Sequence, residues 1–419
     1  MYRNLLRALT ATALLTSFWS VFRLGGLTVF DLLSPLVALV AIPYRAHPKP
    51  THSPRLRLPL AGIFAMVLAG LLSLIISSNA VEHLQRTSAL LIAFCAMLAF
   101  AYLISRKQIL SYTEVLVLLL ISGTASSIAV ILQGDFHVLT SIVPGHGSGT
   151  LQPWQRLTGL AEHPIEAGTV SAFAVVIAMA LAIRAHQWLV YFLPILISIY
   201  SMRYSASLTA FLSLAVGICV ICLYARAYWH LIGMVIAVTL IVASVSLGAM
   251  GTLMASRLQQ FASDPNNYET VAFRETQVRE TLSQITLTTI LFGNGYSLAE
   301  LPLGMEIHNT PIAALFHFGF LGLLSQCLII VFFVRTLWGD ASRHLKGALL
   351  ACMVVFAGPY LTGPSLSRRS IWVPLLTLGA LASSTQIQRR KRRSRLGVRS
   401  DAPITATNHD WSISAHRAI

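Results

Sequence analysis

The stretch FRETQVRE, residues 273–280, lies in the middle of a long polar segment, about 250–308, that separates two strongly hydrophobic segments. Within and beyond this stretch, apolar residues recur at helical intervals, at Phe273, Val278, Leu282, Ile285 and Ile290. The spacing predicts an amphipathic helix. The helix is expected to end at the glycine-rich FGNG (292–295), and EIHNTP (306–311) then leads into the next apolar segment. This arrangement predicts polar groups held at a membrane surface.

Composition places the chain among membrane proteins. Hydrophobic residues make up 55% of the 419 residues and charged residues 11%, with a mean hydropathy of +0.71. No soluble core of this size requires so apolar a composition. The formal net charge is +15, but the basic residues gather in short segments between apolar runs and in the tail. This distribution favours membrane topology and contact with anionic lipid, so nucleic acid is not expected as a partner.

Apolar runs close to the length of a membrane-crossing helix, about 20 residues, recur along the chain. They predict an all-α polytopic protein of about twelve transmembrane helices, at about 8–22, 28–44, 59–79, 88–105, 112–133, 166–184, 188–202, 206–224, 230–250, 309–335, 346–362 and 370–386. The first is interpreted as an uncleaved anchor, because the second follows almost at once. Residues 1–386 are expected to form one membrane domain, and 387–419 a basic, disordered cytoplasmic tail.

The basic loops predict the orientation. With a cytoplasmic amino terminus, the basic tail and the loops that contain Arg45, Arg106, Arg226 and Arg343 all lie inside, as the positive-inside rule requires. The two long polar loops, about 134–165 and 251–308, then lie outside, where a bacterium supplies no ATP. Three arginines fall outside against the rule, and their role, lipid-phosphate contact or a second anion clamp, stays open: Arg203, Arg368 and Arg369.

Common catalytic signatures are missing from the sequence. There is no His-Glu-x-x-His metal motif, phosphate-binding glycine loop or nucleophile elbow. Cys219 and Cys222 have redox spacing but lie within an apolar run, so structural thiols are expected there and at the other three cysteines. No metal and no cofactor is therefore expected.

Several short motifs occur together between about 150 and 335. RLTG (156–159) and His163-Pro164 precede an apolar run, Arg274 lies in the large loop, FGNG follows at 292–295, and His308-Asn309 precede Gly319 and Gly322. This combination resembles the O-antigen ligase and Wzy-type polymerase family of membrane glycosyltransferases. The resemblance implies transfer of a glycan from an undecaprenyl-pyrophosphate carrier to an acceptor hydroxyl at the outer face of the bacterial inner membrane. Polymerisation of repeat units and ligation to a lipid or protein acceptor both remain open.

That reaction suggests roles for individual residues. The pyrophosphate leaving group gains negative charge as the glycosidic bond breaks, and Arg156 and Arg274 supply guanidinium groups suited to it. The acceptor hydroxyl must lose a proton, and His308, with an ordinary pKa of about 6.5, is the predicted base. The donor is already activated, so neither a nucleotide nor a metal is needed. Further predicted substrate-binding residues are Arg279, His163 and Asn309.

Each of these residues has a structural alternative. Arg279 is spaced i, i+4 from Glu275 and could form an ion pair on the helix surface, and Arg274 could pair in a similar way. Arg156 could anchor its loop to lipid headgroups. His308 could be an interface residue beside a cap of the following helix at Asn309.

The expected partners follow from the same reading: a lipid-linked oligosaccharide donor, a glycan or lipid acceptor, anionic lipid at the basic tail, and other membrane proteins of polysaccharide assembly. The alternative function is a multi-span transporter or flippase of a polysaccharide precursor, since about twelve spans is also a transporter number. Transporters usually place ionisable residues near the bilayer midplane and often repeat one half in the other. Here the polar residues gather in the two long loops and no half-to-half repeat is visible, which favours the transferase.

Overall fold

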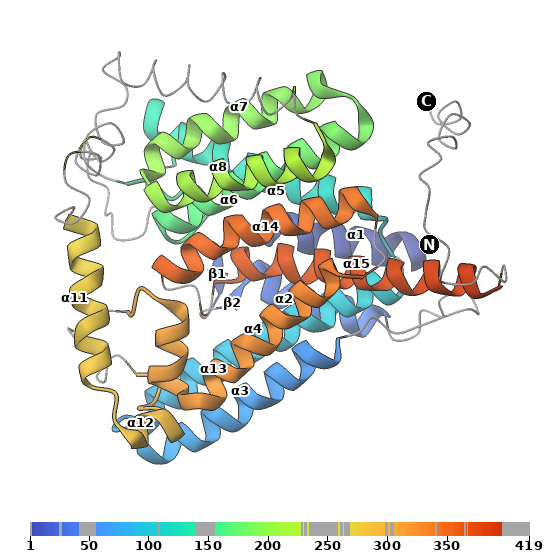
Figure 1. Cartoon of the computed structure of the whole chain (residues 1–419). Coiled ribbons are helices and arrows are strands. Elements are labelled where there is room, and N and C mark those ends of the chain that lie inside the picture. The colour runs from blue at the N-terminus through green and yellow to red at the C-terminus, as the bar shows by residue number, and fades with distance from the viewer. Residues whose placement is uncertain are drawn as a thin grey trace.

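The computed structural model describes residues 2–24, 27–41, 56–107, 109–139, 156–227, 229, 233, 259, 263, 269–297, 301, 306–339, 342–363, 366 and 368–395. In this part of the chain the fold is a bundle of helices (Figure 1), as predicted, joined by one antiparallel pair of two-residue strands. The elements are α1 (Tyr2–Thr16), β1 (Arg23–Leu24), β2 (Leu27–Thr28), α2 (Val29–Ala41), α3 (Arg57–Ile76), α4 (Ala80–Lys107), α5 (Tyr112–Asp135), α6 (Pro164–Ala185), α7 (Trp188–Ser205), α8 (Leu208–Ala225), α11 (Glu269–Ser283), α12 (Leu287–Phe292), α13 (Thr310–Leu337), α14 (Arg343–Thr362) and α15 (Arg369–Arg395).

Seven of the described helices are long and apolar enough to cross a membrane: α3, α4, α5, α6, α8, α13 and α14. Their 18 or more residues match the thickness of the hydrocarbon layer. The range predicted at 230–250 lies outside the described residues, apart from Gly233. The chain is therefore a membrane protein by helix length and hydropathy.

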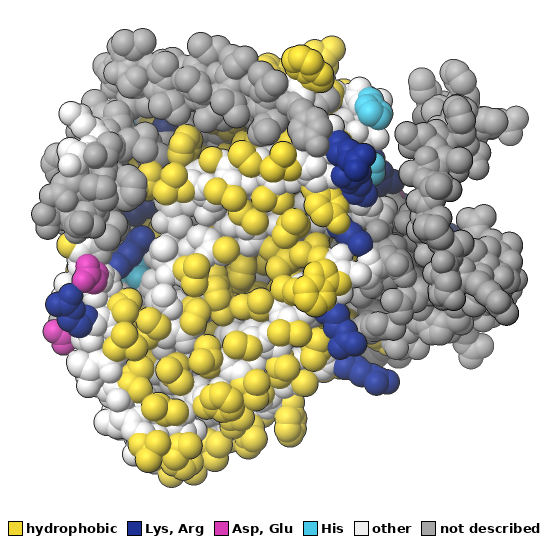
Figure 2. Space-filling view, viewed as in Figure 1, with side chains coloured by type: hydrophobic (Ala, Val, Ile, Leu, Met, Phe, Trp, Pro, Cys, Tyr) yellow, Lys and Arg dark blue, Asp and Glu magenta, His cyan; other side chains and the backbone are white. Residues whose placement is uncertain are grey.

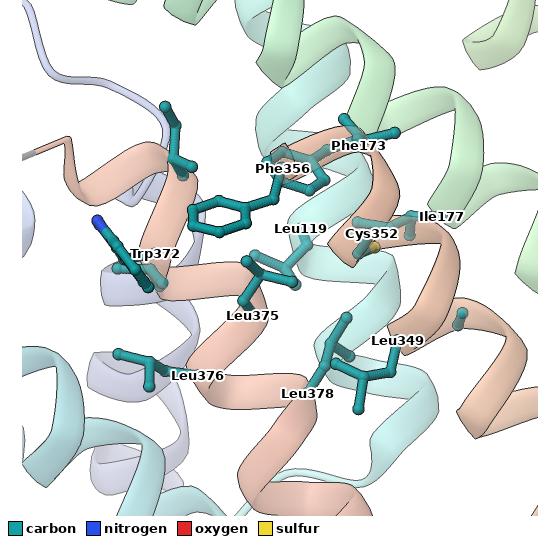
Figure 3. Close-up of a cluster of buried hydrophobic side chains, with 14 of the residues drawn as sticks. Leu119, Phe173, Ile177, Leu349, Cys352, Phe356, Trp372, Leu375, Leu376 and Leu378 are labelled. Carbon is teal, nitrogen blue, oxygen red and sulfur yellow. The ribbon is translucent and has the colours of Figure 1, made fainter. Parts of the chain in front are cut away.

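The helix α6 forms the centre of the bundle. Every residue in its most apolar 18-residue window is buried, because α5, α7, α8 and α14 pack around it. Figure 3 shows the adjoining core, in which Phe173 and Ile177 of α6 lie near side chains of α5, α14 and α15. Trp372 of α15 is fully buried, and its ring centroid lies 4.7 Å from that of Phe356. Aromatic pairs of this kind stabilise a core beyond the effect of the apolar area that they bury.

The bundle has two different ends. At one, here called the basic end, Arg7 pairs with Glu114, the Arg184 guanidinium lies 5.4 Å from the ring centroid of Tyr112, and Arg343 donates to the Tyr224 carbonyl. Figure 2 shows Lys and Arg side chains gathered along the right-hand edge and a broad hydrophobic band beside them. The other end, here called the loop end, contains the segments 156–163 and 306–309 together with Gly363, Leu366 and Arg368.

At the loop end a buried ion pair joins helices that are far apart in sequence. The Arg369 Nε lies 2.7 Å from Asp31 Oδ1, and the Asp31 side chain is 0% exposed. Thr28 donates to the same carboxylate through its backbone N–H and its hydroxyl. Two opposite charges with these hydrogen bonds compensate each other's desolvation, so the pair holds α2 against α15.

Several helix boundaries differ from the prediction, and α4, for example, begins at Ala80 and not at about 88. The helix α1 covers residues 2–16 instead of 8–22, and ends where the Ser17 hydroxyl bonds to the Leu14 carbonyl. The helix α15 continues to Arg395, into the segment from 387 that was predicted to be disordered. Arg, Lys and Gln are strong helix formers, so a helix can extend beyond its apolar part.

The predicted helix around 273–280 is present as α11, but its apolar positions are not its buried face. Phe273 and Leu282 are exposed, whereas Gln277 and Thr281 are fully buried. The helix also ends at Ser283, and a separate helix, α12, begins after the Thr286 cap. The buried face is polar because α11 packs on the backbone of residues 306–308, whose N–H and C=O groups need partners.

Candidate functional site

Five charged or imidazole side chains meet at the loop end. They come from separate parts of the chain. The pKa of His163 is lowered first by burial and then by the charges of Arg368, Arg156 and Arg274 and of His308 in its protonated form. An electrostatic effect of this kind requires that the groups lie near one another. This loop-end cluster consists of Arg156, His163, Arg274, His308 and Arg368. Three of its members, Arg156, Arg274 and His308, are the predicted catalytic residues.

His163 is the N-cap of α6. Its Nδ1 accepts the backbone N–H of Ile165 at 3.1 Å, which satisfies one of the N–H groups that a helix start leaves unpaired. Since Nδ1 accepts, the neutral ring carries its proton on Nε2. Burial, followed by the charges of the cluster, lowers the pKa of His163 to about 3. The residue is thus neutral and can donate a hydrogen bond from Nε2.

His308 lies directly before α13 and is held by α11. Its backbone N–H donates to Gln277 Oε1 at 2.9 Å, and its ring centroid lies 6.3 Å from that of Phe273, edge to face. Burial lowers the pKa of His308 and the Arg274 guanidinium lowers it further, while Glu306 acts in the opposite direction. The imidazole is therefore neutral at neutral pH, as a base must be before it takes a proton.

The two predicted arginines reach the cluster from different sides. The Nε–H of Arg156 donates to the Ser205 carbonyl at 2.8 Å, which fixes the guanidinium against the end of α7. Arg274 lies on α11, three residues before Gln277 and hence on nearly the same helix face. Its charge acts on both His308 and His163. Both arginines are half-buried, so neither is a simple surface cation.

Arg368 was not among the predicted site residues, although its position against the charge rule singled it out. Its guanidinium lies 2.6 Å from Glu162 Oε2, 3.9 Å from Glu166 Oε2 and 3.8 Å from Glu306 Oε2. Burial would lower the pKa of Arg368, but the three carboxylates outweigh it and raise that pKa. Arg368 therefore ties the start of α6 to the segment that carries His308.

The role left open for Arg203 is structural in this geometry. Its guanidinium lies 2.6 Å from Asp135 Oδ1 at the end of α5. The carbon of the same group lies 3.7 Å from the ring centroid of Tyr200 and 4.3 Å from that of Tyr204. The group is thus held between a carboxylate and two aromatic faces, an arrangement that joins α5 to α7.

The remaining two predicted substrate-binding residues have structural contacts. Arg279 is 78% exposed and lies 2.7 Å from Glu275, the ion pair that its spacing allowed. Asn309 is the N-cap of α13: its Oδ1 accepts from Ile312 N and its Nδ2 donates to the Leu361 carbonyl, each at 3.1 Å. Both functions of the Asn309 amide are used within the protein, as the capping alternative requires.

The glycine motif and Gly319 form one contact. Gly319 has φ 64° and ψ −162°, which interrupts α13 after Phe318. The backbone N–H groups of Asn294 and Gly295 donate to the Phe316 and His317 carbonyls at 2.8 and 3.1 Å. Residues of FGNG thus donate hydrogen bonds to carbonyls near the break in the helix. They support the site without belonging to it.

The helices α6 and α13 are linked through α14. The helix α14 packs against both, and α13 packs chiefly against α3. At the loop end, the Thr310 hydroxyl donates to the Gly363 carbonyl at 3.1 Å, just after α14. Segments carrying His163 and His308 still meet, because Arg368 and its carboxylates bridge them.

Comparison of the chain with protein-family models and with curated proteins gives no match.

Proposed function

We propose that this protein transfers a glycan from an undecaprenyl-pyrophosphate carrier to an acceptor hydroxyl, the reaction that the resemblance to the O-antigen ligase and Wzy-type polymerase family implies. The observation that carries the proposal is the loop-end cluster: two half-buried arginines, Arg156 and Arg274, beside the neutral imidazole of His308. This combination provides positive charge for a leaving group and a proton acceptor for a nucleophile, the two needs of the reaction.

In the proposed step, the acceptor oxygen forms a bond to the anomeric carbon while the bond from that carbon to the phosphate oxygen breaks. The pyrophosphate leaves with the electron pair, and the acceptor proton passes to His308. Arg156 and Arg274 stabilise the charge that develops on the pyrophosphate; the bond from Arg156 to the Ser205 carbonyl orients its guanidinium in advance. His163 donates from Nε2 to a glycan hydroxyl or a phosphate oxygen.

The proposed topology has about twelve spans in the bacterial inner membrane, with a cytoplasmic amino terminus and the loop end outside. The positive-inside rule supports it, since the arginines of the basic end would face the cytoplasm. A single cysteine at Ser283 of α11 should react with a membrane-impermeant maleimide in cells, and one at His186 of the basic end should not. Both positions are exposed, so the reverse labelling pattern would invert the orientation.

The test of the reaction uses purified protein in lipid vesicles with an undecaprenyl-pyrophosphate glycan and an acceptor, in EDTA and without nucleotide. His308→Ala should lower the rate about 10²–10⁴-fold, the range for a lost general base. Arg156→Lys and Arg274→Lys keep the charge but lose the planar fork, so each should lower it about tenfold or more. Arg279→Lys, on the exposed face of the same helix as Arg274, is the matched control and should be nearly silent.

Three outcomes separate the alternatives. A wild-type rate in a normally inserted His308→Ala protein would refute the base assignment. Passage of intact lipid-linked glycan across the bilayer, with no transfer, would favour the transporter. In a deletion strain, loss of glycan chain length would indicate a polymerase and loss of attachment a ligase.

A further inference from the structure

The side chain of Gln277 is the buried contact between α11 and the segment that carries His308. It is 0% exposed. Its Nε2 donates to the Glu306 carbonyl at 2.8 Å, and its Oε1 accepts the backbone N–H of His308 at 2.9 Å. A carbonyl can only accept and a backbone N–H can only donate, so both bonds independently fix which way the amide faces.

The same amide oxygen faces the His308 ring. The distance from Gln277 Oε1 to His308 Nδ1 is 3.1 Å. An amide oxygen has no proton to give, so this hydrogen bond requires the proton on Nδ1. In the neutral imidazole the lone pair then resides on Nε2, the nitrogen farther from Gln277. One buried side chain thus determines which nitrogen of His308 can accept a proton.

The charges around His308 make this tautomer control useful. Burial, then Arg274 of α11 and Arg368 before α15, lower its pKa, and Glu306 of its own segment raises it. His163, at the start of α6, is the other imidazole in the cluster. A ring kept neutral by these surroundings has two possible tautomers, and only one presents a basic Nε2.

We infer that Gln277 is a positioning residue: it holds His308 in the Nδ1–H tautomer so that Nε2 receives the proton of the attacking hydroxyl. The inference rests on the proposed function for the identity of that hydroxyl. The contacts of Gln277 are part of the fold whatever the substrate is.

The test compares wild type with Gln277→Glu and Gln277→Leu in the full chain. Gln277→Glu places a carboxylate beside Nδ1, which favours the imidazolium and moves the acid limb of the pH–rate profile about 1 to 3 pH units higher. Gln277→Leu removes the acceptor and lowers kcat about tenfold or more with little change in KM, since ground-state binding does not require the tautomer. The pKa of His308 is measured separately, from deuterium exchange at the imidazole C2 by mass spectrometry.

The matched control is Thr281→Val. Thr281 is fully buried on the same face of α11, one turn further on, and its hydroxyl donates to the Gln277 backbone carbonyl at 2.7 Å. Any effect that comes only from weaker packing of α11 should therefore also occur in Thr281→Val, without a change in the pKa of His308. An unchanged His308 pKa and acid limb in Gln277→Glu would overturn the inference. A raised His308 pKa in a protein whose wild type transfers no glycan would retain the tautomer assignment and reject the proposed function.

Discussion

Replacing Gly293 with Ala should destabilise the loop end severely. Gly293 has φ 77° and ψ 172°, a region that is almost restricted to glycine, where an L-residue costs about 1–3 kcal/mol. An added Cβ would also lie 2.3 Å from the His317 carbonyl oxygen and 2.6 Å from Phe318 N. These are backbone atoms that cannot rotate away, and overpacking of this kind costs about 1–3 kcal/mol more. The expected loss is thus about 2–6 kcal/mol, a large part of the stability of a typical protein.

The assay measures the thermal unfolding midpoint of the purified protein in detergent. The fraction of the protein that stays monodisperse is measured as well. Gly233→Ala is the matched control, because an added Cβ there meets nothing within 4 Å. The variant Gly319→Ala should act like Gly293→Ala, since its Cβ would lie 2.9 Å from Gly293 N. If Gly293→Ala melted at the temperature of the control, the account of FGNG as a support for the α13 break would be refuted.

Three further predictions concern the loop end. Arg368→Gln leaves the buried Glu166 without its nearby cation and should lower the free energy of unfolding by about 3–5 kcal/mol. The loss should appear as a lower unfolding midpoint, and an unchanged midpoint would contradict the proposed bridge. Asn309→Ala removes the cap of α13 and the hydrogen bond to the Leu361 carbonyl, and should lower the free energy of unfolding by about 1–3 kcal/mol. Asn309→Asp keeps the cap and should lose less stability. Equal losses in the two variants would argue against capping. The pKa of His163 is about 3 in the folded protein and about 6.5 unfolded, so the unfolded chain binds more protons. The stability from neutral His163 is therefore complete above pH 6.5 and declines as pH falls from there toward 3; the midpoint of His163→Asn should fall less steeply than that of wild type over this range.

The all-α class and the positions of most described helices could be predicted because apolar runs of near-membrane length are a local signal. Capping was local too: Asn309 before Thr310-Pro311 indicated the start of α13, which the structure confirms. The face that α11 buries could not be predicted from periodicity. Gln277 and Thr281 are buried because their partners are backbone groups of a segment about 30 residues away, and no pattern within the helix reports such a partner.

For the candidate site, the sequence identified four of the five cluster residues as site residues, and the roles assigned to them stay predictions. Arg368 was missed because its carboxylate partners, Glu162 and Glu306, come from two other segments of the chain. The state of His163 was equally inaccessible. Its acceptor Nδ1 depends on the geometry of the α6 start, and its low pKa on burial by residues that are distant in sequence.

The buried pair of Asp31 and Arg369 has a consequence for the order of biosynthesis. While the chain is being made, Asp31 leaves the ribosome with α2 long before α15 is synthesised. A buried charge without its partner costs about 3–5 kcal/mol, so α2 cannot settle in its final place until α15 arrives. Arg368 is synthesised immediately before that helix. Closure of the bundle and completion of the loop-end cluster therefore both depend on the same late stretch of chain, and a chain that lacks α15 is expected to have an incomplete site.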